Sequence, residues 1–480
     1  FLTGAGQSLW QILPLGHTGY GDSPYQAFSA FAGQPLLISP DELIKDGLLY
    51  GDDLRNYPHF NPDHIYYGDV IPAKLRILHR SYEIFKESAD LCMLKEFDVF
   101  CEHEKDWLDD YALFMAGKDA HGGWLEWEDD LRDPDEEIKA AWRERLADSI
   151  EYYKYIQFIF FRQWNAIRDY AHVNGIKIVG DIPIFVALDS ADVWANRELF
   201  QLEKDGYPTV VAGVPPDYFS ATGQLWGNPL YDWDYHKKTH YDWWMRRIKG
   251  QLNMVDYIRV DHFRGFEQYY AIPYGEETAM HGKWKKGPNE DLFLRMQEVF
   301  GKDLPIWAED LGIITPRVEK LRDDFNLPGM KVLQFAFGDP KDNDILPHRF
   351  TTENCICYTG THDNDTVVGW YETLSEDDKK FLEHYLKYST IERTGTVHLD
   401  LISLALESRS DMVIIPLQDY LGLGNEARIN TPSTVGGNWE WRVKEEQLTD
   451  ELKELIRTLT IKYRTVAEEN AKKAAEEAQQ

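Results

Sequence analysis

Seven short apolar segments recur along the chain, and each of them ends in polar residues. They are residues 8–15, 175–186, 257–261, 305–309, 330–337, 356–361 and 412–416. Helical segments separate them, which is the rhythm of parallel strands joined by crossover helices. Eight such strands close a barrel, and barrels with insertions exceed about 400 residues as single units. For a chain of 480 residues the sequence therefore predicts an α/β fold, a (β/α)₈ barrel of which seven strands are visible.

The predicted strands divide the chain into three parts. Residues 1–40 contain the first visible strand and its glycine-rich loop, and residues 175–480 continue the barrel. Residues 41–174 hold no strong buried strand but many helical periods, so we expect a large helical insertion packed on the barrel. From residue 449 onward the apolar stripe predicts an amphipathic C-terminal helix, and we expect no C-terminal β-domain.

A segment rich in proline, glycine and aromatic residues at 213–233 is the clearest candidate for a substrate wall. A structureless loop of that length in a compact domain is usually functional or disordered, and its density of aromatic residues argues against disorder. We expect this loop and a second one at 418–440 to line a substrate groove at the carboxyl ends of the strands.

The charge balance excludes several classes of partner. Lys and Arg total 51 against 82 Asp and Glu, a net charge of -31, so nucleic acid or an anionic membrane surface would be repelled. No apolar run reaches the roughly 20 residues that span a bilayer. The four cysteines are too few and too scattered for a disulfide framework or a zinc site. We therefore expect a neutral substrate, a cytoplasmic location, and a monomer or weak homodimer.

Carboxylates stand at the ends of three predicted strands, at Asp261, Glu309 and Asp363. Successive side chains of a strand point to opposite faces, so Arg259 shares a face with Asp261. A charged group at the end of a buried strand is costly to desolvate and is usually there for chemistry. Carboxylates gathered at one mouth repel each other, so at least one pKa should rise, as a general acid requires. A nucleophilic Asp beside such a Glu is the pattern of retaining glycosyl transfer.

Several motifs carry a resemblance to known enzymes. Those at 259–265 (Arg-Val-Asp-His-Phe-Arg-Gly), 307–312 and 361–365 resemble the catalytic motifs of the alpha-amylase clan. Those at 21–26, 180–187, 214–220 and 430–439 resemble the 4-alpha-glucanotransferases, also called amylomaltases or disproportionating enzymes. The resemblance extends from the first residues to about Arg442, and no other family combines these motifs in this order.

The resemblance implies a retaining enzyme that needs no cofactor and no metal. It would transfer alpha-1,4-glucan segments between maltooligosaccharides, or glucans derived from starch or glycogen, and release glucose. Asp261 would be the nucleophile, Glu309 the acid/base and Asp363 the stabiliser of the transition state. Arg259 would orient Asp261, and His362 would bind a glucose hydroxyl. The other residues implied to line the glucan groove are Tyr25, Asp181, Tyr218, Phe219, Trp226 and Asn228.

The chain departs from the family at its beginning. The family starts with a strand and a His-Pro-containing loop ahead of the position of Phe1, so the resemblance implies that the first barrel strand is absent from this sequence. The edges of the strands at 8–15 and 412–416 would then face an unfilled slot, and unpaired edges invite pairing with another chain. We expect these two strands not to be hydrogen-bonded to each other.

Other readings of the same residues stay open at this point. Asp181 is also suited to cap a following helix, Trp226 and Tyr218 to pack beneath a loop, and His362 to a structural role. An alpha-glucan hydrolase of the same clan would use the same three carboxylates, and a non-catalytic glucan-binding protein would need only the aromatic residues. A metal-dependent hydrolase is disfavoured because the His-Glu-x-x-His motif is missing.

A dinucleotide-binding oxidoreductase is the remote alternative. Residues 422–427 fit the pattern Gly-x-Gly-x-x-Ala. The match is short, and it follows the last strand of the series instead of opening a first βαβ unit.

Overall fold

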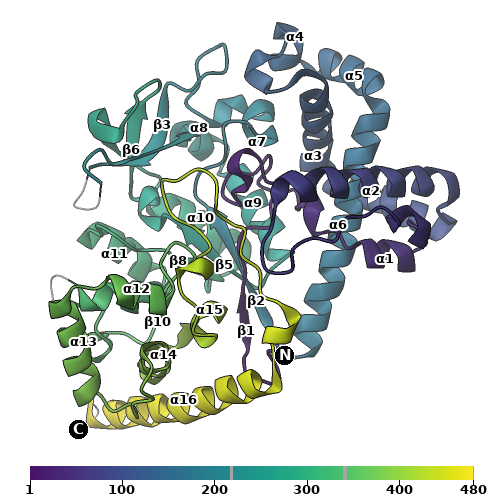
Figure 1. Cartoon of the computed structure of the whole chain (residues 1–480). Coiled ribbons are helices and arrows are strands. Elements are labelled where there is room, and N and C mark those ends of the chain that lie inside the picture. Colours follow the sequence, from purple (N-terminus) through teal and green to yellow (C-terminus); the bar gives the residue numbers. More distant parts are fainter. Residues whose placement is uncertain (217–219, 339–342, 479–480) are drawn as a thin grey trace.

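Seven short parallel strands form the centre of the protein. The computed structural model describes residues 1–216, 220–338 and 343–478. The strands are β1 (Leu9–Gln11), β2 (Lys177–Pro183), β5 (Tyr257–Asp261), β8 (Ile306–Ala308), β9 (Gly329–Val332), β10 (Cys355–Tyr358) and β11 (Met412–Ile414). They pair in the orders β1-β2-β5-β8 and β11-β10-β9, and every pair is parallel (Figure 1). The seven strands predicted from the sequence are confirmed.

The two sheets enclose one interior. Ala308 N donates a hydrogen bond of 2.9 Å to Pro328 O, which joins the end of β8 to the start of β9. Side chains of all seven strands pack into a single cluster: Leu9, Val179, Tyr257, Trp307, Met330, Val332, Ile356, Tyr358, Met412 and Ile414. Because every second residue of a strand points to the same face, this cluster marks the inner face of a barrel-like wall.

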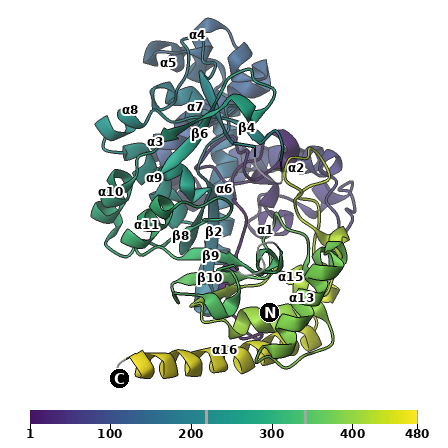
Figure 2. The ribbon, with the colours of Figure 1, turned by 90° about the vertical axis from the view of Figure 1, so that its left-hand side faces the viewer.

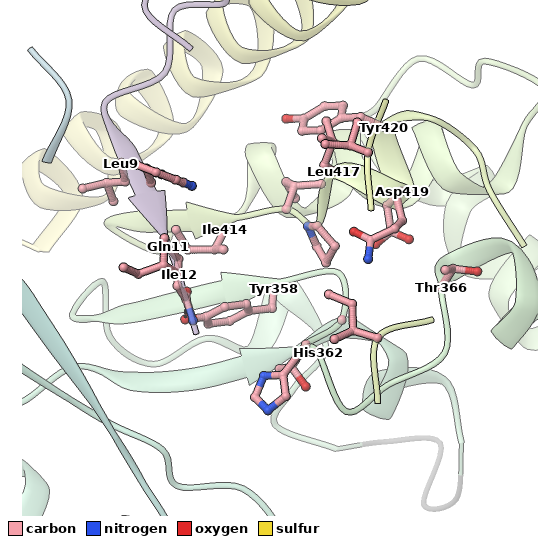
Figure 3. Close-up of a pocket in the computed structure, with 18 of the residues that line it drawn as sticks. Leu9, Gln11, Ile12, Tyr358, His362, Thr366, Ile414, Leu417, Asp419 and Tyr420 are labelled. Atoms are coloured by element: carbon pink, nitrogen blue, oxygen red, sulfur yellow. Dashed lines mark hydrogen bonds between the residues drawn. The ribbon is translucent and has the colours of Figure 1, made fainter. Parts of the chain in front are cut away.

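The wall is open between β1 and β11, which do not pair in the described part of the chain. A cavity of about 550 Å³ lies between them, with Leu9 on one side and Ile414 on the other (Figure 3). Tyr358 and Gln11 line this cavity, and Tyr358 Oη donates a hydrogen bond of 2.9 Å to Gln11 Oε1. The expectation that these two strands would not be hydrogen-bonded to each other is confirmed.

The chain between β1 and β2 is mostly helical, on the right of Figure 1. Its helices are α1 (Pro40–Lys45), α2 (Tyr67–Ser88), α3 (Leu91–His121), α4 (Asp129–Arg132), α5 (Glu136–Arg145) and α6 (Ala147–Val173). Asp135 begins α5 by accepting a hydrogen bond of 2.8 Å from Ile138 N. α5 and α6 are separate helices, because Leu146 between them has a non-helical backbone with φ -107° and ψ 18°.

Gly33 fixes the contact between this helical region and the barrel. Its N–H donates to Gln157 Oε1 at 2.7 Å, and a Cβ in its place would lie 1.9 Å from the Phe160 ring. We expect Gly33→Ala to lower the free energy of unfolding by about 1–3 kcal/mol, because the overpacked ring must move. Gly51→Ala, where a Cβ meets no atom within 4 Å, is the matched control. Chemical denaturation measures both, and an equal loss in the two variants would contradict the packing argument.

A second sheet corrects the sequence-based description of residues 213–233. Its four antiparallel strands have the order β4-β3-β6-β7: β3 (Val210–Val214), β4 (Gln224–Pro229), β6 (Gln268–Pro273) and β7 (Lys283–Lys286). The segment predicted as one structureless loop therefore contains the end of β3 and all of β4. The prediction was wrong because glycine and proline within these short strands were taken as loop signals. Tyr218 and Phe219 lie outside the described residues.

The remaining helices surround the strands. They are α7 (Ala191–Ala195), α8 (Trp233–Lys238), α9 (Asp242–Leu252), α10 (Glu290–Phe300), α11 (Pro316–Asp324), α12 (Val367–Thr373), α13 (Glu376–Tyr388), α14 (Val397–Glu407), α15 (Leu417–Tyr420) and α16 (Asp450–Ala478). α16 runs along the bottom of the molecule in both views (Figures 1 and 2). Of the predicted apolar stripe it buries Leu452, Ile456, Leu459 and Tyr463, and it leaves Leu455 half-buried. Among the described residues, no helix has both the length and the apolar character needed to cross a membrane.

Candidate active site

The pairing of β2 with β5 builds the first charged cluster. The register places Asp181 beside Arg259, on the inner face of the wall. Arg259 Nη1 lies 2.6 Å from Asp181 Oδ2, and its Nη2 lies 2.9 Å from Asp261 Oδ1. The Arg259 and Asp181 side chains are almost completely buried, and such a guanidinium needs carboxylate partners. Asp181 on β2 thus binds Arg259 on the neighbouring strand β5 and does not cap a helix, and Arg259 in turn holds Asp261 at the end of β5.

Glu309 stands beside Asp261, one residue beyond the end of β8. Its Oε2 accepts a hydrogen bond of 2.7 Å from His262 N, and its Oε1 accepts one of 2.9 Å from Leu311 N. Burial, followed by the charge of Asp261, raises the pKa of Glu309 to about 8. Burial also raises the pKa of Asp261, but the Arg259 guanidinium opposes that rise. The pair can therefore hold a proton on Glu309 while Asp261 is charged.

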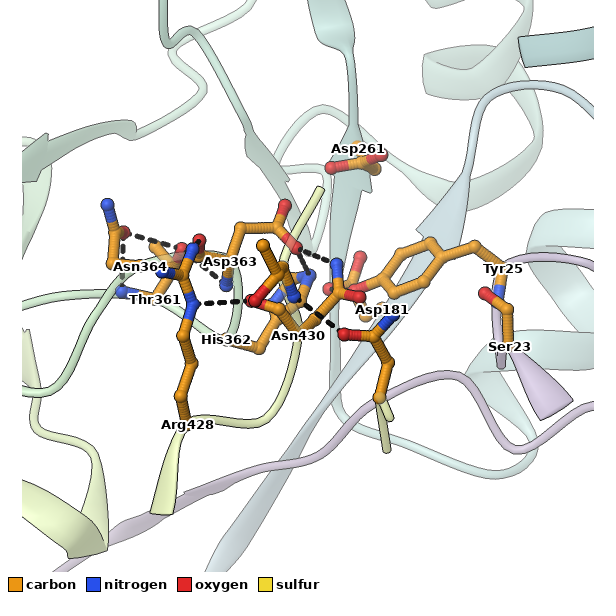
Figure 4. A network of polar contacts seen from close by, with 12 residues as sticks. Ser23, Tyr25, Asp181, Asp261, Thr361, His362, Asp363, Asn364, Arg428 and Asn430 are labelled. Carbon is orange, nitrogen blue, oxygen red and sulfur yellow. Dashed lines mark hydrogen bonds and ion pairs between the residues drawn. The ribbon is translucent and has the colours of Figure 1, made fainter. Parts of the chain in front are cut away.

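Asp363, the third carboxylate, lies on the loop that follows β10. Its Oδ1 accepts a hydrogen bond of 2.7 Å from Asn430 Nδ2 and lies 3.3 Å from His362 Nε2 (Figure 4). Its side chain is 44% exposed, whereas that of Arg259 is only 4% exposed. Asp363 therefore lies on the exposed side of the charged cluster. Its orientation depends on loop residues instead of a neighbouring strand.

A cavity of about 600 Å³ opens in front of Asp261 and Asp363. Its walls include Tyr25, Trp226, Asn228, Asp261, His262, His362, Asp363 and Trp439. The Tyr25 ring stacks on the His362 ring with centroids 5.2 Å apart, and Tyr25 Oη donates to Asp181 Oδ2 at 2.9 Å. Flat aromatic faces beside carboxylates suit a ligand with apolar faces and many hydroxyls, as a sugar ring has.

Trp226 and Asn228 both lie on β4 and both line the cavity, but their surroundings differ. The Trp226 ring meets the His262 ring edge-on at 4.8 Å and stays half-buried. Asn228 is buried, and its Nδ2 donates to Val186 O at 2.9 Å. Trp226 therefore offers a ring face to a ligand, whereas the amide group of Asn228 also ties β4 to the loop after β2.

The structure adds site residues that the sequence reading did not single out. His262 follows Asp261 with a positive φ of 55°, which turns its N–H toward Glu309. Burial lowers the pKa of His262 to about 3, so its ring is neutral. Arg428, Asn430 and Trp439 come from the loop after α15. Asn430 and Trp439 belong to the motif at 430–439, and Arg428 lies just before it, within the loop at 418–440 that was expected to line the groove. The sequence assigned no partner to any of the three.

Comparison with known proteins identifies the family. A family model described as 4-alpha-glucanotransferase matches residues 1–449. The chain belongs to the 4-alpha-glucanotransferase family. The 4-alpha-glucanotransferase of Synechocystis is 47% identical over 466 residues, which cover 96% of this chain and 92% of that protein. The 4-alpha-glucanotransferase of Thermus thermophilus is 48% identical over 456 residues, 94% of this chain and 90% of the relative.

Solved structures agree with this 4-alpha-glucanotransferase assignment. The amylomaltase of Streptococcus agalactiae, solved in complex with acarbose, superposes with a TM-score of 0.91 at 39% identity. The match covers 96% of this chain and 93% of that chain. The seven strands and their helices therefore belong to the (β/α)₈ fold of the amylomaltases, as the sequence predicted.

The structure gives no support to the remote alternative, a dinucleotide-binding oxidoreductase. Residues 422–427, which fit a dinucleotide-binding pattern, follow the short helix α15 and end in the 3₁₀ turn Asn425–Ala427. A dinucleotide fingerprint needs its glycines between a strand and the first turn of a long helix, where the backbone N–H groups bind the pyrophosphate. Within the described residues, no three His, Cys, Asp or Glu side chains are grouped as metal ligands would be.

Proposed function

We propose that this chain transfers alpha-1,4-glucan segments between maltooligosaccharides by a retaining double displacement. The observation that carries the proposal is the unequal pair of Asp261 and Glu309. Arg259 holds Asp261 at 2.9 Å and favours its ionised form, while burial raises the pKa of Glu309 to about 8. A retaining enzyme needs two neighbouring carboxyl groups, one ionised to act as the nucleophile and one protonated to act as the acid.

In the first step, Asp261 attacks the anomeric carbon of the donor and forms a β-glucosyl ester. The bond to the leaving glucan breaks, and the proton on Glu309 passes to its oxygen. In the second step, Glu309 takes the proton from the 4-hydroxyl of an acceptor glucan, which attacks the ester and restores the α-linkage. Positive charge develops on the sugar in both steps, and the Asp363 carboxylate is suited to stabilise it.

The same site would be a hydrolase if water reached the ester first. Water is present at about 55 M in any open site, so a transferase must bind the acceptor sugar firmly or exclude water. The rings of Tyr25, Trp226 and Trp439 line the cavity, and they are surfaces on which an acceptor sugar could stack.

The cytoplasmic location and the monomeric or weakly dimeric state expected from the sequence stay predictions.

Incubation with maltotriose alone tests the function. We expect glucose and a ladder of longer maltooligosaccharides at a nearly constant concentration of reducing ends, because each transfer breaks one glycosidic bond and forms another. Chromatography of the products together with a reducing-end assay measures both quantities. A steady rise of reducing ends with only shorter products would identify an alpha-glucan hydrolase instead.

Trp226→Ala tests how acceptor binding controls this partition. We expect the ratio of hydrolysis to transfer to rise about tenfold, with a smaller change in the total rate of bond cleavage, because a stacking surface for the acceptor is lost. Trp284→Ala is the matched control, since Trp284 lies on β7 of the same sheet and packs against Arg264 outside the cavity lining. A similar shift of the ratio in both variants would argue against a direct contact of Trp226 with the acceptor.

A further inference from the structure

We propose that Asn430 and Arg428 are positioning residues that set the orientation of the Asp363 carboxylate during glucan transfer. The inference rests on the proposed role of Asp363 as the group that stabilises charge on the sugar. Both residues lie on the loop after α15, more than sixty positions beyond Asp363 in the chain. In Figure 4 both residues lie beside Asp363.

Asn430 binds both the side chain of Asp363 and the backbone beside it. Its Nδ2 donates to Asp363 Oδ1 at 2.7 Å, and its backbone N donates to His362 O at 3.1 Å. His362 Nε2 lies 3.3 Å from the same Oδ1. Among the described residues, no group donates a hydrogen bond to Asp363 Oδ2. Asn430 thus selects one oxygen of Asp363 for the protein and leaves the other for a ligand in the cavity.

Arg428 binds the backbone of both residues that form the Asn430–Asp363 contact. Its Nη2 donates to Asp363 O at 2.7 Å, and its Nε donates to Asn430 O at 2.8 Å. Its Nη1 forms an ion pair with Asp365 Oδ1. The guanidinium is a rigid planar fork, so these three contacts hold the two loops at one spacing. A lysine ammonium has no such fork and cannot make the same set of bonds.

Asp363 needs this support because no strand neighbour provides it. Arg259 reaches Asp261 from within the same strand, but Asp363 lies on an irregular loop with a side chain that is 44% exposed. A stabilising carboxylate acts only if it is held where charge develops, before the reaction begins. Asn430 is a neutral donor, so it orients Asp363 without cancelling the negative charge that an oxocarbenium-like transition state requires.

Steady-state kinetics of Asn430→Ala and Arg428→Lys test the proposal. We expect kcat for maltotriose disproportionation to fall about 10- to 100-fold in each variant, with KM within about threefold of wild type, because a misplaced carboxylate loses only transition-state stabilisation. Asn354→Ala is the control, since it removes an amide that bonds to Asn326 far from the cavity. A rise of KM at unchanged kcat would assign Asn430 to glucan binding alone and overturn the proposal.

Asn430→Asp is a second variant, which tests the proposal even if Asn430→Ala fails to fold. It keeps the side-chain shape but replaces the donor by a carboxyl group that faces Asp363. We expect a loss of kcat at least as large as in Asn430→Ala, and one that grows with pH as the two carboxyl groups repel each other. A thermal midpoint near that of wild type together with wild-type kcat at every pH would overturn the proposal.

A double-mutant cycle separates this inference from the proposed function. With α-glucosyl fluoride as a reactive donor, we expect Asn430→Ala to have no further effect once Asp363→Asn is present, because Asn430 acts through Asp363. If Asn430→Ala lowered kcat by the same factor with Asp363 present and with Asp363→Asn, the inference would be overturned. Full activity of Asp363→Asn would instead remove the proposed role of Asp363, whatever the effect of Asn430→Ala on the wild-type background.

Discussion

Asp261→Asn is expected to lower kcat for maltotriose disproportionation by at least about 10⁴-fold, because an amide cannot form the glucosyl ester. Binding of maltotriose should stay within about threefold of wild type, since the substitution changes little volume. The buried Arg259 keeps Asp181 at 2.6 Å as a counter-ion, so the fold should survive the loss of charge. Turnover assays and isothermal titration calorimetry measure the two effects.

The control for this variant is Asp291→Asn, which removes a surface carboxylate paired with Lys237 and should leave kcat unchanged. If Asp261→Asn kept more than about one percent of wild-type turnover, another group would have to be the nucleophile. A loss of maltotriose binding in parallel with turnover would point to damage of the cavity and not to missing chemistry.

Glu309→Gln is expected to lower kcat on maltotriose by about 10²- to 10⁴-fold, because the leaving glucan can no longer be protonated. Release of fluoride from α-glucosyl fluoride in the first turnover should stay close to wild type, since fluoride leaves without a proton. A burst experiment that follows fluoride measures this first step alone. An equal loss on both donors would argue that Glu309 is not the general acid.

The pH profile follows from the same residue. The pKa of Glu309 is raised to about 8, so the acid is protonated below that pH and loses its proton above it. Turnover of maltotriose should therefore decline above about pH 8, and it should also fall at low pH as Asp261 gains a proton. First-turnover release of fluoride from α-glucosyl fluoride by the unsubstituted protein should show no such alkaline decline, because fluoride leaves without a proton. An alkaline decline that persists unchanged would have to come from another group.

The sequence by itself determined the features that depend on local spacing. Short apolar segments that end in polar residues, with helical segments between them, predicted all seven parallel strands. The two-residue period of a strand is likewise written in consecutive positions. The same period put Arg259 and Asp261 on one face, and the structure joins them at 2.9 Å. The stripe of Leu452, Ile456 and Leu459 predicted the last helix in the same way.

The family resemblance added what spacing alone left open. The three carboxylates, Tyr25, Asp181 and His362 were assigned to one site from motifs far apart in the chain, and the structure brings them together. Residues 213–233 were less predictable, because glycine and proline concealed the strands β3 and β4. In the second sheet β3 pairs with β4 on one side and with β6 on the other. Strand formation there depends on a partner segment that local propensity does not contain.

Only the tertiary structure decided the features that depend on contacts between distant segments. The pKa of Glu309 rises because the surrounding chain buries it and, second, because the charge of Asp261 lies nearby, and both causes exist only in the folded wall. Asn430 reaches Asp363 across 67 positions of sequence, and no periodic pattern records a hydrogen bond that forms only when two loops meet.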